Sequence, residues 1–133
     1  MTDVEVVEAI YAAMGERDFD RLFELVDESV VITQDARLPW GGRHEGHEGL
    51  GEFAVKLTGT IDSAVTSESL FAADDEVIQA GRTKGTVVAT GVPFDVAEVH
   101  RWTVRDGKAV TAHFAIDTAA MLDALAEVGE SEG

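Results

Sequence analysis

The spacing of apolar residues along the chain changes near Gly59, and this change constrains the fold more than any other feature. Before it, apolar residues recur every three or four positions, which is typical of helices that bury one face. After it, the chain contains four long strand-like runs, separated by turn signals such as Asp106-Gly107. Early helices that pack against a later antiparallel sheet indicate an α+β domain.

Local signals set the expected boundaries. Thr2-Asp-Val-Glu5 has the form of a capping box, and Pro39-Trp-Gly-Gly42 is typical of a turn. The first helix carries an apolar stripe up to Met14, where Gly15 and Asp18 interrupt it. The other expected helices cover residues 19–26, 47–57 and 118–126, and the expected strands cover residues 30–35, 61–70, 76–90, 94–105 and 108–116.

The length of 133 residues fits one domain, which we place at residues 1–128, followed by a frayed acidic tail at residues 129–133. No apolar run approaches the roughly 18 residues of a membrane span, and the N-terminus lacks the pattern of a signal peptide. The chain contains no cysteine, which excludes disulfides and thiol nucleophiles. We therefore expect a soluble cytoplasmic protein with no membrane partner.

The formal net charge is −16, from 10 basic and 26 acidic residues. Binding to nucleic acid requires clustered lysine and arginine, so this composition argues against a nucleic-acid partner. The acids are dispersed and lysine is scarce, which is typical of proteins that work at high salt, where self-repulsion is screened. An acidic surface without any adaptation to salt is the alternative.

Two apolar strands end in a carboxylate, at Asp35 and at Asp117. Acids in these positions predict a pocket that handles a proton. Each has a simpler interpretation, because Asp35 can face solvent at a strand end and Asp117 can cap the following helix. The run His44-Glu-Gly-His-Glu48 does not have the His-Glu-x-x-His spacing of a zinc site, so no metal site is predicted.

Four segments resemble landmarks of the nuclear transport factor two-like superfamily, and more narrowly of its SnoaL-like polyketide cyclase and ketosteroid isomerase-related group. They are Gly15-Glu-Arg-Asp-Phe-Asp-Arg-Leu22, Leu38-Pro-Trp-Gly-Gly-Arg-His-Glu-Gly46, Val104-Arg-Asp-Gly-Lys108 and Ile116-Asp-Thr-Ala-Ala120. The resemblance implies a curved antiparallel or mixed sheet wrapped around helices, a cone-shaped barrel with an internal pocket. It also implies a homodimer.

The resemblance suggests roles for four site residues. Asp35 falls near the general base of the ketosteroid isomerases, and Asp117 matches the general acid of the cyclase-like members. Arg82 matches the arginine of the epoxide hydrolases of this fold, but the acid expected two residues later is Lys84. This departure argues against a classical epoxide hydrolase. His100 is a further candidate acid or base, with a structural role as its alternative.

Five more residues are predicted to bind a substrate. Tyr11 lies near the place of the isomerase tyrosine, but the protonated aspartate that accompanies it in those enzymes has no counterpart in Val96-Ala-Glu-Val-His100. Alternation places Glu98 and Trp102 on one strand face with His100. Trp40 and Phe53 are expected to line an apolar pocket, or else to belong to the core.

Three hypotheses follow. The first is a SnoaL-like enzyme that uses these acids on a small hydrophobic carbonyl compound, without a metal or organic cofactor, as an isomerase, cyclase or hydratase. It requires Asp35, Arg82 and Asp117 to line one enclosed space, and should be dropped if they point to different surfaces. The second is a non-catalytic binder of a hydrophobic metabolite in an apolar pocket, and the third is a dimerisation domain with no cavity.

Overall fold

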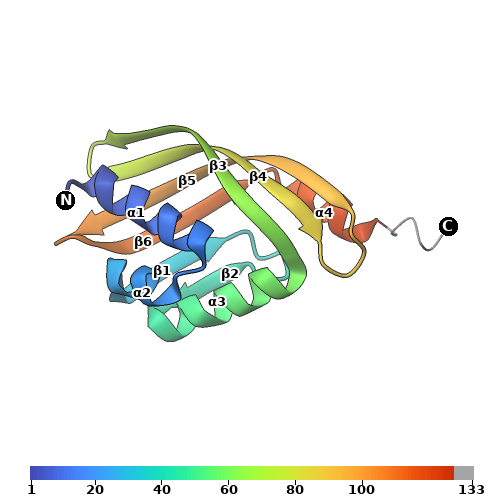
Figure 1. The fold of residues 1–133 in the computed structure, drawn as a ribbon, viewed down its shortest axis with the longest axis horizontal. Helices are drawn as coiled ribbons and strands as arrows, with labels where there is room; N and C mark the ends of the chain where they lie inside the picture. The colour runs from blue at the N-terminus through green and yellow to red at the C-terminus, as the bar shows by residue number, and fades with distance from the viewer. Residues whose placement is uncertain (128–133) are drawn as a thin grey trace.

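The computed structural model describes residues 1–127, which form four helices and one six-stranded sheet (Figure 1). The elements are α1 (Asp3–Glu16), α2 (Phe19–Leu25), β1 (Val26–Gln34), β2 (Gly42–Glu45), α3 (Gly46–Thr60), β3 (Ile61–Ala73), β4 (Glu76–Val87), β5 (Pro93–Arg105), β6 (Lys108–Ile116) and α4 (Thr118–Ala126). The expected acidic tail at residues 129–133 lies outside the described residues.

The sheet order is β2-β1-β6-β5-β4-β3, so the strands from β3 to β6 form a meander. Neighbouring strands are antiparallel except for β1 and β6, which are parallel, and the sheet is therefore mixed. It is not closed, because β2 and β3 are its edges over residues 1–127. The result is the expected cone-like α+β fold, with α1, α2 and α3 on one side of the curved sheet (Figure 1).

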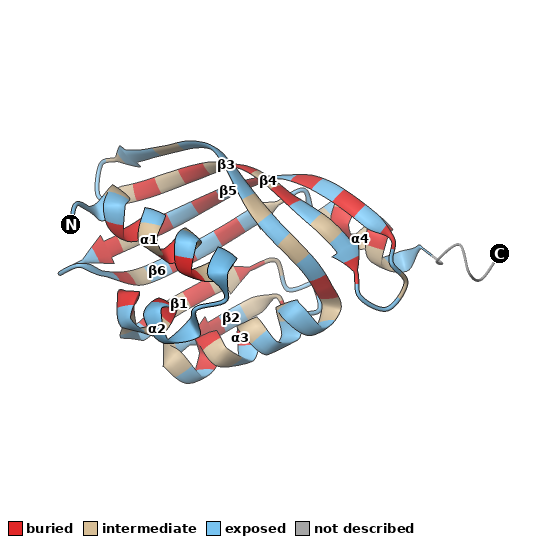
Figure 2. Ribbon diagram, viewed as in Figure 1, coloured by how far each residue is buried: buried red, intermediate tan, exposed pale blue. Residues whose placement is uncertain are grey.

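Alternation along the strands separates the buried and exposed faces of the sheet. In β5 every second residue from Phe94 to Val104 is buried, and the residues between them are mostly exposed (Figure 2). The buried residues face the helices and form the concave face, and the others form the convex face. The core therefore lies between the concave face and the helices.

Two glycines of β4 allow β3 to approach closely. A Cβ atom at Gly81 or Gly85 would overlap the carbonyl oxygen of Thr66 or Asp62 in β3. The register between β3 and β4 also shifts between Ser67 and Ser69, which marks a bulge. Bulges and glycines bend strands locally, so this part of the sheet can curve over the space beneath it.

The expected helix starts are confirmed by their caps. Thr2 and Glu5 form the capping box of α1, and the Asp18 side chain accepts from the backbone nitrogen of Arg21 at the start of α2. The sequence did not predict β2, where a turn was expected up to Gly42. This strand has four residues and pairs only with β1 at the sheet edge, too short a run for alternation to reveal.

Candidate functional site

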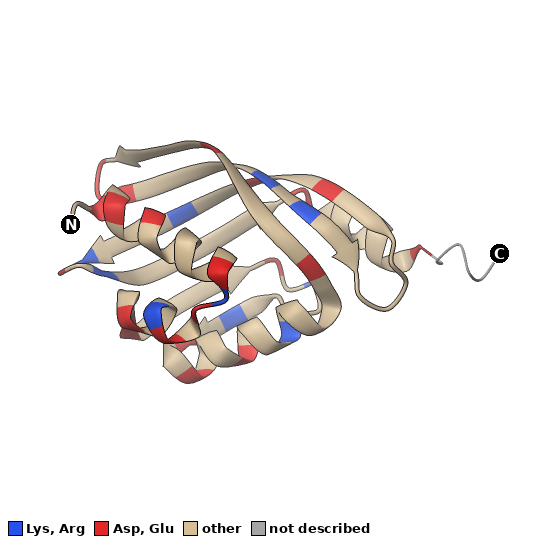
Figure 3. Cartoon of the chain, in the orientation of Figure 1, with Lys and Arg blue, Asp and Glu red and all other residues tan. Residues whose placement is uncertain are grey.

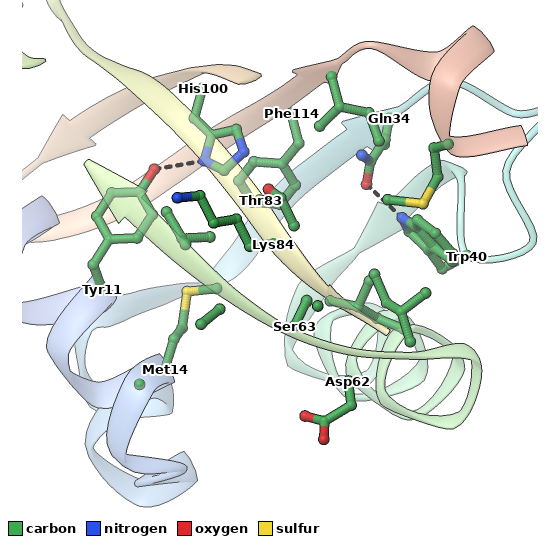
Figure 4. Close-up of a pocket in the computed structure, with 18 of the residues that line it drawn as sticks. Tyr11, Met14, Gln34, Trp40, Asp62, Ser63, Thr83, Lys84, His100 and Phe114 are labelled. Carbon is green, nitrogen blue, oxygen red and sulfur yellow. Dashed lines mark hydrogen bonds between the residues drawn. The ribbon is translucent and has the colours of Figure 1, made fainter. Parts of the chain in front are cut away.

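A cavity of about 550 Å³ lies between the concave face of the sheet and the helices α1 and α3 (Figure 4). Its wall is mostly apolar, with residues contributed by α1, α3, five strands and α4. The apolar and aromatic lining residues used below are Trp40, Phe53, Phe114 and Met121. The presence of this cavity removes the hypothesis of a domain without an internal space.

Tyr11 from α1 and His100 from β5 form the main polar pair on the cavity wall. The hydroxyl oxygen of Tyr11 lies 2.6 Å from Nδ1 of His100 (Figure 4). Nε1 of Trp102 donates to the same hydroxyl oxygen at 2.9 Å, from behind the cavity wall. Tyr11 is therefore held by two partners on β5, two residues apart on one strand face.

Glu98 continues this polar chain into the interior. Its side chain is fully buried, and Oε2 lies 3.0 Å from Nε2 of His100. The other oxygen, Oε1, accepts a short hydrogen bond from the Thr83 hydroxyl. Oε2 itself has no well-aligned hydrogen-bond partner among the described residues, so a proton step to His100 requires a small rotation of one group.

Burial sets the charges of these groups. It raises the pKa of Glu98, although hydrogen bonds from Thr83 and Gln79 act in the opposite direction. Burial also lowers the pKa of His100 to about 3 and raises the pKa of the Tyr11 hydroxyl. All three shifts favour the neutral form, as expected for ionisable groups removed from water. A neutral imidazole has one nitrogen that donates and one that accepts.

The neutral forms allow two directions of hydrogen bonding, and one of them leaves a donor at the cavity. The Trp102 indole can only donate, so the Tyr11 oxygen must accept from it. If Glu98 is protonated at Oε2 and donates to Nε2 of His100, the proton of the imidazole is on Nδ1 and points to Tyr11. The Tyr11 oxygen then accepts twice, which leaves its own O–H free to donate into the cavity.

The structure places Asp35 outside the cavity. Its carboxylate accepts from Nε and Nη2 of Arg37, at 3.0 and 2.7 Å, and from the Arg37 backbone. The Arg37 side chain lowers the pKa of Asp35 to about 2, so it remains a carboxylate. Strand β1 ends one residue earlier, and alternation points Gln34 into the cavity instead. The expected pocket role of Asp35 as a base has no support in this geometry.

Asp117 is the N-cap of α4. Its Oδ1 accepts from the backbone nitrogen of Ala120 at 3.1 Å, and it does not line the cavity. Arg82 lies on the convex face of β4, where it pairs with Asp95 and not with Asp117. The three residues Asp35, Arg82 and Asp117 therefore do not meet in one space, and the first hypothesis, an enzyme that uses these acids, is dropped. An apolar pocket with Asp35 outside it and Asp117 capping a helix is the arrangement that the binder hypothesis predicts.

The remaining predicted residues lie in or directly behind the cavity. Tyr11, Trp40 and Phe53, which were predicted to bind a substrate, line it, and so does His100, the further candidate acid or base. Glu98 and Trp102 lie on the same strand face as His100 but contact it or Tyr11 from behind. Glu98 can therefore affect a bound molecule only through His100, and Trp102 only through Tyr11.

The two histidines near the start of α3 bind backbone oxygens. Nε2 of His44 lies 3.0 Å from the Trp40 carbonyl oxygen, and Nε2 of His47 lies 2.8 Å from that of Val26. Within residues 1–127, no group of three or more His, Cys, Asp or Glu residues is arranged to hold a metal ion. None of the helices in the same range combines the length and apolarity needed to cross a membrane.

Sequence reasoning missed three polar residues of the site. Gln34 lines the cavity, Thr83 both lines it and binds Glu98, and Gln79 is fully buried beside them with its Nε2 donating to Ser67. The available signal was alternation, because each occupies a strand position whose neighbours two residues away are apolar or buried. Polar residues on an otherwise apolar face are informative for this reason.

A mixed, open α+β sheet around an apolar cavity, with a buried polar chain at one wall, defines the class of this protein. The family model for the SnoaL-like domain matches residues 7–112, more than half of the chain. The chain therefore belongs to the SnoaL-like domain family of the nuclear transport factor two-like superfamily. A search of curated proteins finds no match.

Solved structures support the fold. An NTF2-like protein from Burkholderia thailandensis is 26% identical with a TM-score of 0.88, and the match covers 96% of this chain and 99% of that chain. TerC co-crystallised with polyporic acid is 24% identical with a TM-score of 0.85, over 93% and 98% of the two chains. A putative polyketide cyclase from Pseudomonas putida is 17% identical with a TM-score of 0.83, over 95% and 99%. The last two likenesses show the fold alone.

Proposed function

We propose that this protein carries out acid/base chemistry on an apolar carbonyl compound bound in the cavity, as an isomerase, cyclase or hydratase. The observation that carries the proposal is the chain from Tyr11 through His100 to Glu98, which leads from the cavity wall into the interior. Apolar walls would hold the body of the compound, and the polar chain would meet its carbonyl oxygen.

The proton moves in balanced steps. The Tyr11 O–H gives its proton to the carbonyl oxygen, and the Nδ1 proton of His100 replaces it on the Tyr11 oxygen. Glu98 gives its proton to Nε2 of His100, so the imidazole stays neutral and Glu98 becomes a carboxylate. An isomerisation that passes through an enol re-forms the carbonyl in its second half and returns this proton along the same chain. In a single keto-to-enol conversion the enol keeps the proton, and Glu98 regains one from the water that took the proton from carbon.

This assignment differs from the sequence hypothesis in where the chemistry occurs. Asp62 is the carboxylate among the lining residues, and its side chain is 78% exposed and lies 3.6 Å from Arg17. The chain therefore assists at the carbonyl oxygen, while a proton on carbon would go to water or to another group of the substrate. Tyr11 is the residue that touches the substrate, and Glu98 acts through His100.

A second candidate function is non-catalytic binding of a hydrophobic metabolite. The observation that favours it is the position of Asp35 and Asp117, which both lie outside the cavity. Asp35 accepts hydrogen bonds from Arg37, and Asp117 caps α4. In this case the Tyr11 hydroxyl would bind a ligand oxygen without transferring a proton. Turnover separates the two candidates, because both require binding in the same cavity.

The test uses 1-phenylbutane-1,3-dione, an apolar 1,3-diketone whose enol absorbs in the ultraviolet. The rate of its keto–enol relaxation after dilution into buffer would be measured with and without the protein. We expect the wild-type protein to accelerate the relaxation. Tyr11→Phe should lower the protein-dependent rate about 100-fold, since positioned proton transfer typically contributes about 10²–10⁴-fold.

Asp95→Asn is the matched control, because Asp95 is on β5 but faces the convex side. It should leave the rate unchanged. Isothermal titration with the same diketone reports binding separately from turnover. A wild-type protein that binds the diketone and does not accelerate its relaxation would establish the non-catalytic candidate instead.

We also propose that the protein forms a homodimer, as the resemblance implies. The convex face of the sheet exposes large apolar side chains, with Val99 43% and Phe71 49% exposed. Residues paired across strands share a face, and Val99 is paired with Ala80 while Phe71 is paired with Ile78. Light scattering after size exclusion would measure the mass, and a monomer over the micromolar range would contradict the proposal.

A further inference from the structure

The cavity wall carries a second polar group, the side-chain amide of Gln34 at the end of β1. Gln34 is 8% exposed, and its Oε1 accepts from Nε1 of Trp40 at 2.9 Å (Figure 4). Both side chains line the cavity. This pair is separate from the chain of Tyr11, His100 and Glu98, and the proton transfer proposed above does not use it.

The Trp40 contact fixes which end of the amide is free. An indole nitrogen can only donate, so the atom that faces it must be the amide oxygen of Gln34. Nε2 is then the free end, and it forms no hydrogen bond to any of residues 1–127. An amide nitrogen can only donate. The free end of the amide therefore presents a donor to the cavity at this point.

The position of this donor is held firmly. The Trp40 side chain is among the most buried of the described residues, at 1% exposure. Its backbone oxygen is contacted by Nε2 of His44 at 3.0 Å, which ties the loop before β2 to β2 itself. A donor held by a buried partner costs little further ordering when a ligand binds to it.

The sheet register gives the spacing between the two polar groups. Gln34 is paired with Phe114 in the parallel β1–β6 ladder, and Phe114 is paired with His100 in the β5–β6 ladder. Neighbouring strands lie about 4.8 Å apart, so the backbones of Gln34 and His100 are roughly 10 Å apart. The Phe114 side chain lies between them on the same concave face, with its ring centroid 4.7 Å from that of His100.

We infer that the ligand of this cavity is a compound with two hydrogen-bond acceptors on opposite sides of an apolar, ring-sized body. One acceptor receives the Tyr11 hydroxyl, and the other receives Nε2 of Gln34, while the body lies over Phe114. The inference rests on the proposed function for its first acceptor only. Gln34 would decide which compounds bind and in which orientation, and would not take part in proton transfer.

The test compares 1-tetralone, which has one carbonyl, with its acetyl derivatives, which carry a second carbonyl on the other ring. Dissociation constants would be measured by isothermal titration for the 5-, 6- and 7-acetyl compounds. We expect one of them to bind the wild-type protein about tenfold more tightly than 1-tetralone, the value of one well-formed hydrogen bond. Equal binding of all four compounds would overturn the inference.

Gln34→Glu, measured at a pH at which its carboxyl group is ionised, is the decisive variant, because it then keeps an oxygen for Trp40 and replaces the free donor with an acceptor. It should abolish the preference for the acetyl compound and should favour the matching hydroxy-tetralone, which can donate. Asp35→Asn, the adjacent residue outside the cavity, is the control and should keep the wild-type preference. If Gln34→Glu retained the preference for the acetyl compound, the inference would be wrong.

The two proposals fail in different measurements. Loss of the acetyl preference in Gln34→Glu, in a protein that does not accelerate diketone relaxation, would uphold the two-acceptor ligand and reject the proton transfer. If Gln34→Glu kept the acetyl preference while diketone turnover depended on Tyr11, the proton transfer would be upheld and the two-acceptor ligand rejected. Unfolding midpoints of both variants, with and without ligand, check that each is folded.

Discussion

The two faces of β5 carry similar residue types in opposite environments. On the convex face, Arg101 pairs with Glu76 at 3.1 Å and Asp95 pairs with Arg82, all with partly exposed side chains. On the concave face, Glu98 and His100 lie 3.0 Å apart with side-chain exposures of 0% and 7%. The convex pairs stay charged in water, whereas burial favours the neutral forms of the concave pair.

This contrast teaches that the face of the strand, more than the residue type, decides which acids can do chemistry. The chain has 26 acidic residues, and those within residues 1–127 are spread over helices, strands and turns (Figure 3). Most of them are solvated or locally paired. Glu98 differs because its neighbours two positions away are also buried, so it cannot turn to water.

The largest effect expected from this contrast is on turnover. His100→Asn on the concave face should lower the diketone relaxation rate about 100-fold, because it interrupts the path between Tyr11 and Glu98. Arg101→Gln, the next residue on the convex face, should change the rate less than twofold. Initial rates at several diketone concentrations would separate a loss in turnover from a loss in binding.

Equal losses in His100→Asn and Arg101→Gln would show that the two faces do not differ in function. A selective loss in His100→Asn with an unchanged dissociation constant would support proton relay over simple binding. Tyr11 is left intact in both variants, so the residue that contacts the substrate is the same.

The second effect is on stability. Glu98→Ala should lower the free energy of unfolding by about 2–3 kcal/mol, because it leaves the Thr83 hydroxyl and Nε2 of His100 buried without a partner. Asp95→Ala removes an exposed partner of Arg82 and should cost less than about 1 kcal/mol. Urea unfolding monitored by tryptophan fluorescence would measure both. Similar costs would mean that burial does not distinguish the two carboxylates.

The third effect is the dependence of stability on pH. The pKa of His100 is about 3 in the fold and about 6.5 when unfolded, so below pH 6.5 the unfolded chain takes up a proton that the folded chain does not. Its contribution to stability is therefore lost as pH falls from 6.5 towards 3, by about 1.4 kcal/mol per pH unit. Glu98 acts in the opposite sense, because its raised pKa favours the folded state at low pH and that contribution is lost as pH rises above 4.5.

The two contributions oppose each other above pH 4.5, over the range in which both groups titrate, and Glu98→Gln exposes the His100 contribution. Unfolding free energies of Glu98→Gln should fall more steeply with decreasing pH than those of the wild-type protein. The double variant Glu98→Gln/His100→Asn should lack this additional slope. A slope unchanged by the second substitution would show that His100 is not a buried neutral group.

Periodicity predicted most of the fold, because long elements repeat their signal many times. The strand from Lys108 to Ile116 and the capping box at Thr2 were predicted from local rules and are confirmed. The edge strand β2 has four residues, too few for the alternation of buried and exposed positions to be recognised in the sequence. Its pairing with β1 is a tertiary contact that local sequence does not encode.

The site was predictable only in part. Strand alternation placed Glu98, His100 and Trp102 on one face, and they are buried together. The error at Asp35 was a shift of one residue, because the strand ends at Gln34 and a single step changes the face. Which of the two neighbours is inside depends on the exact strand end, and strand ends are the least predictable feature of a sequence.

The smallest effect concerns Asp117, the acid that the sequence made most prominent. Asp117→Ala removes the side chain that accepts from Ala120 at the start of α4 and should lower the free energy of unfolding by about 1 kcal/mol. Asp117→Asn keeps an accepting oxygen and should restore most of this loss. Neither should change diketone turnover, because Asp117 does not line the cavity. A loss of turnover in both variants, without a matching loss of stability in Asp117→Asn, would return Asp117 to the site and contradict the division between the two faces.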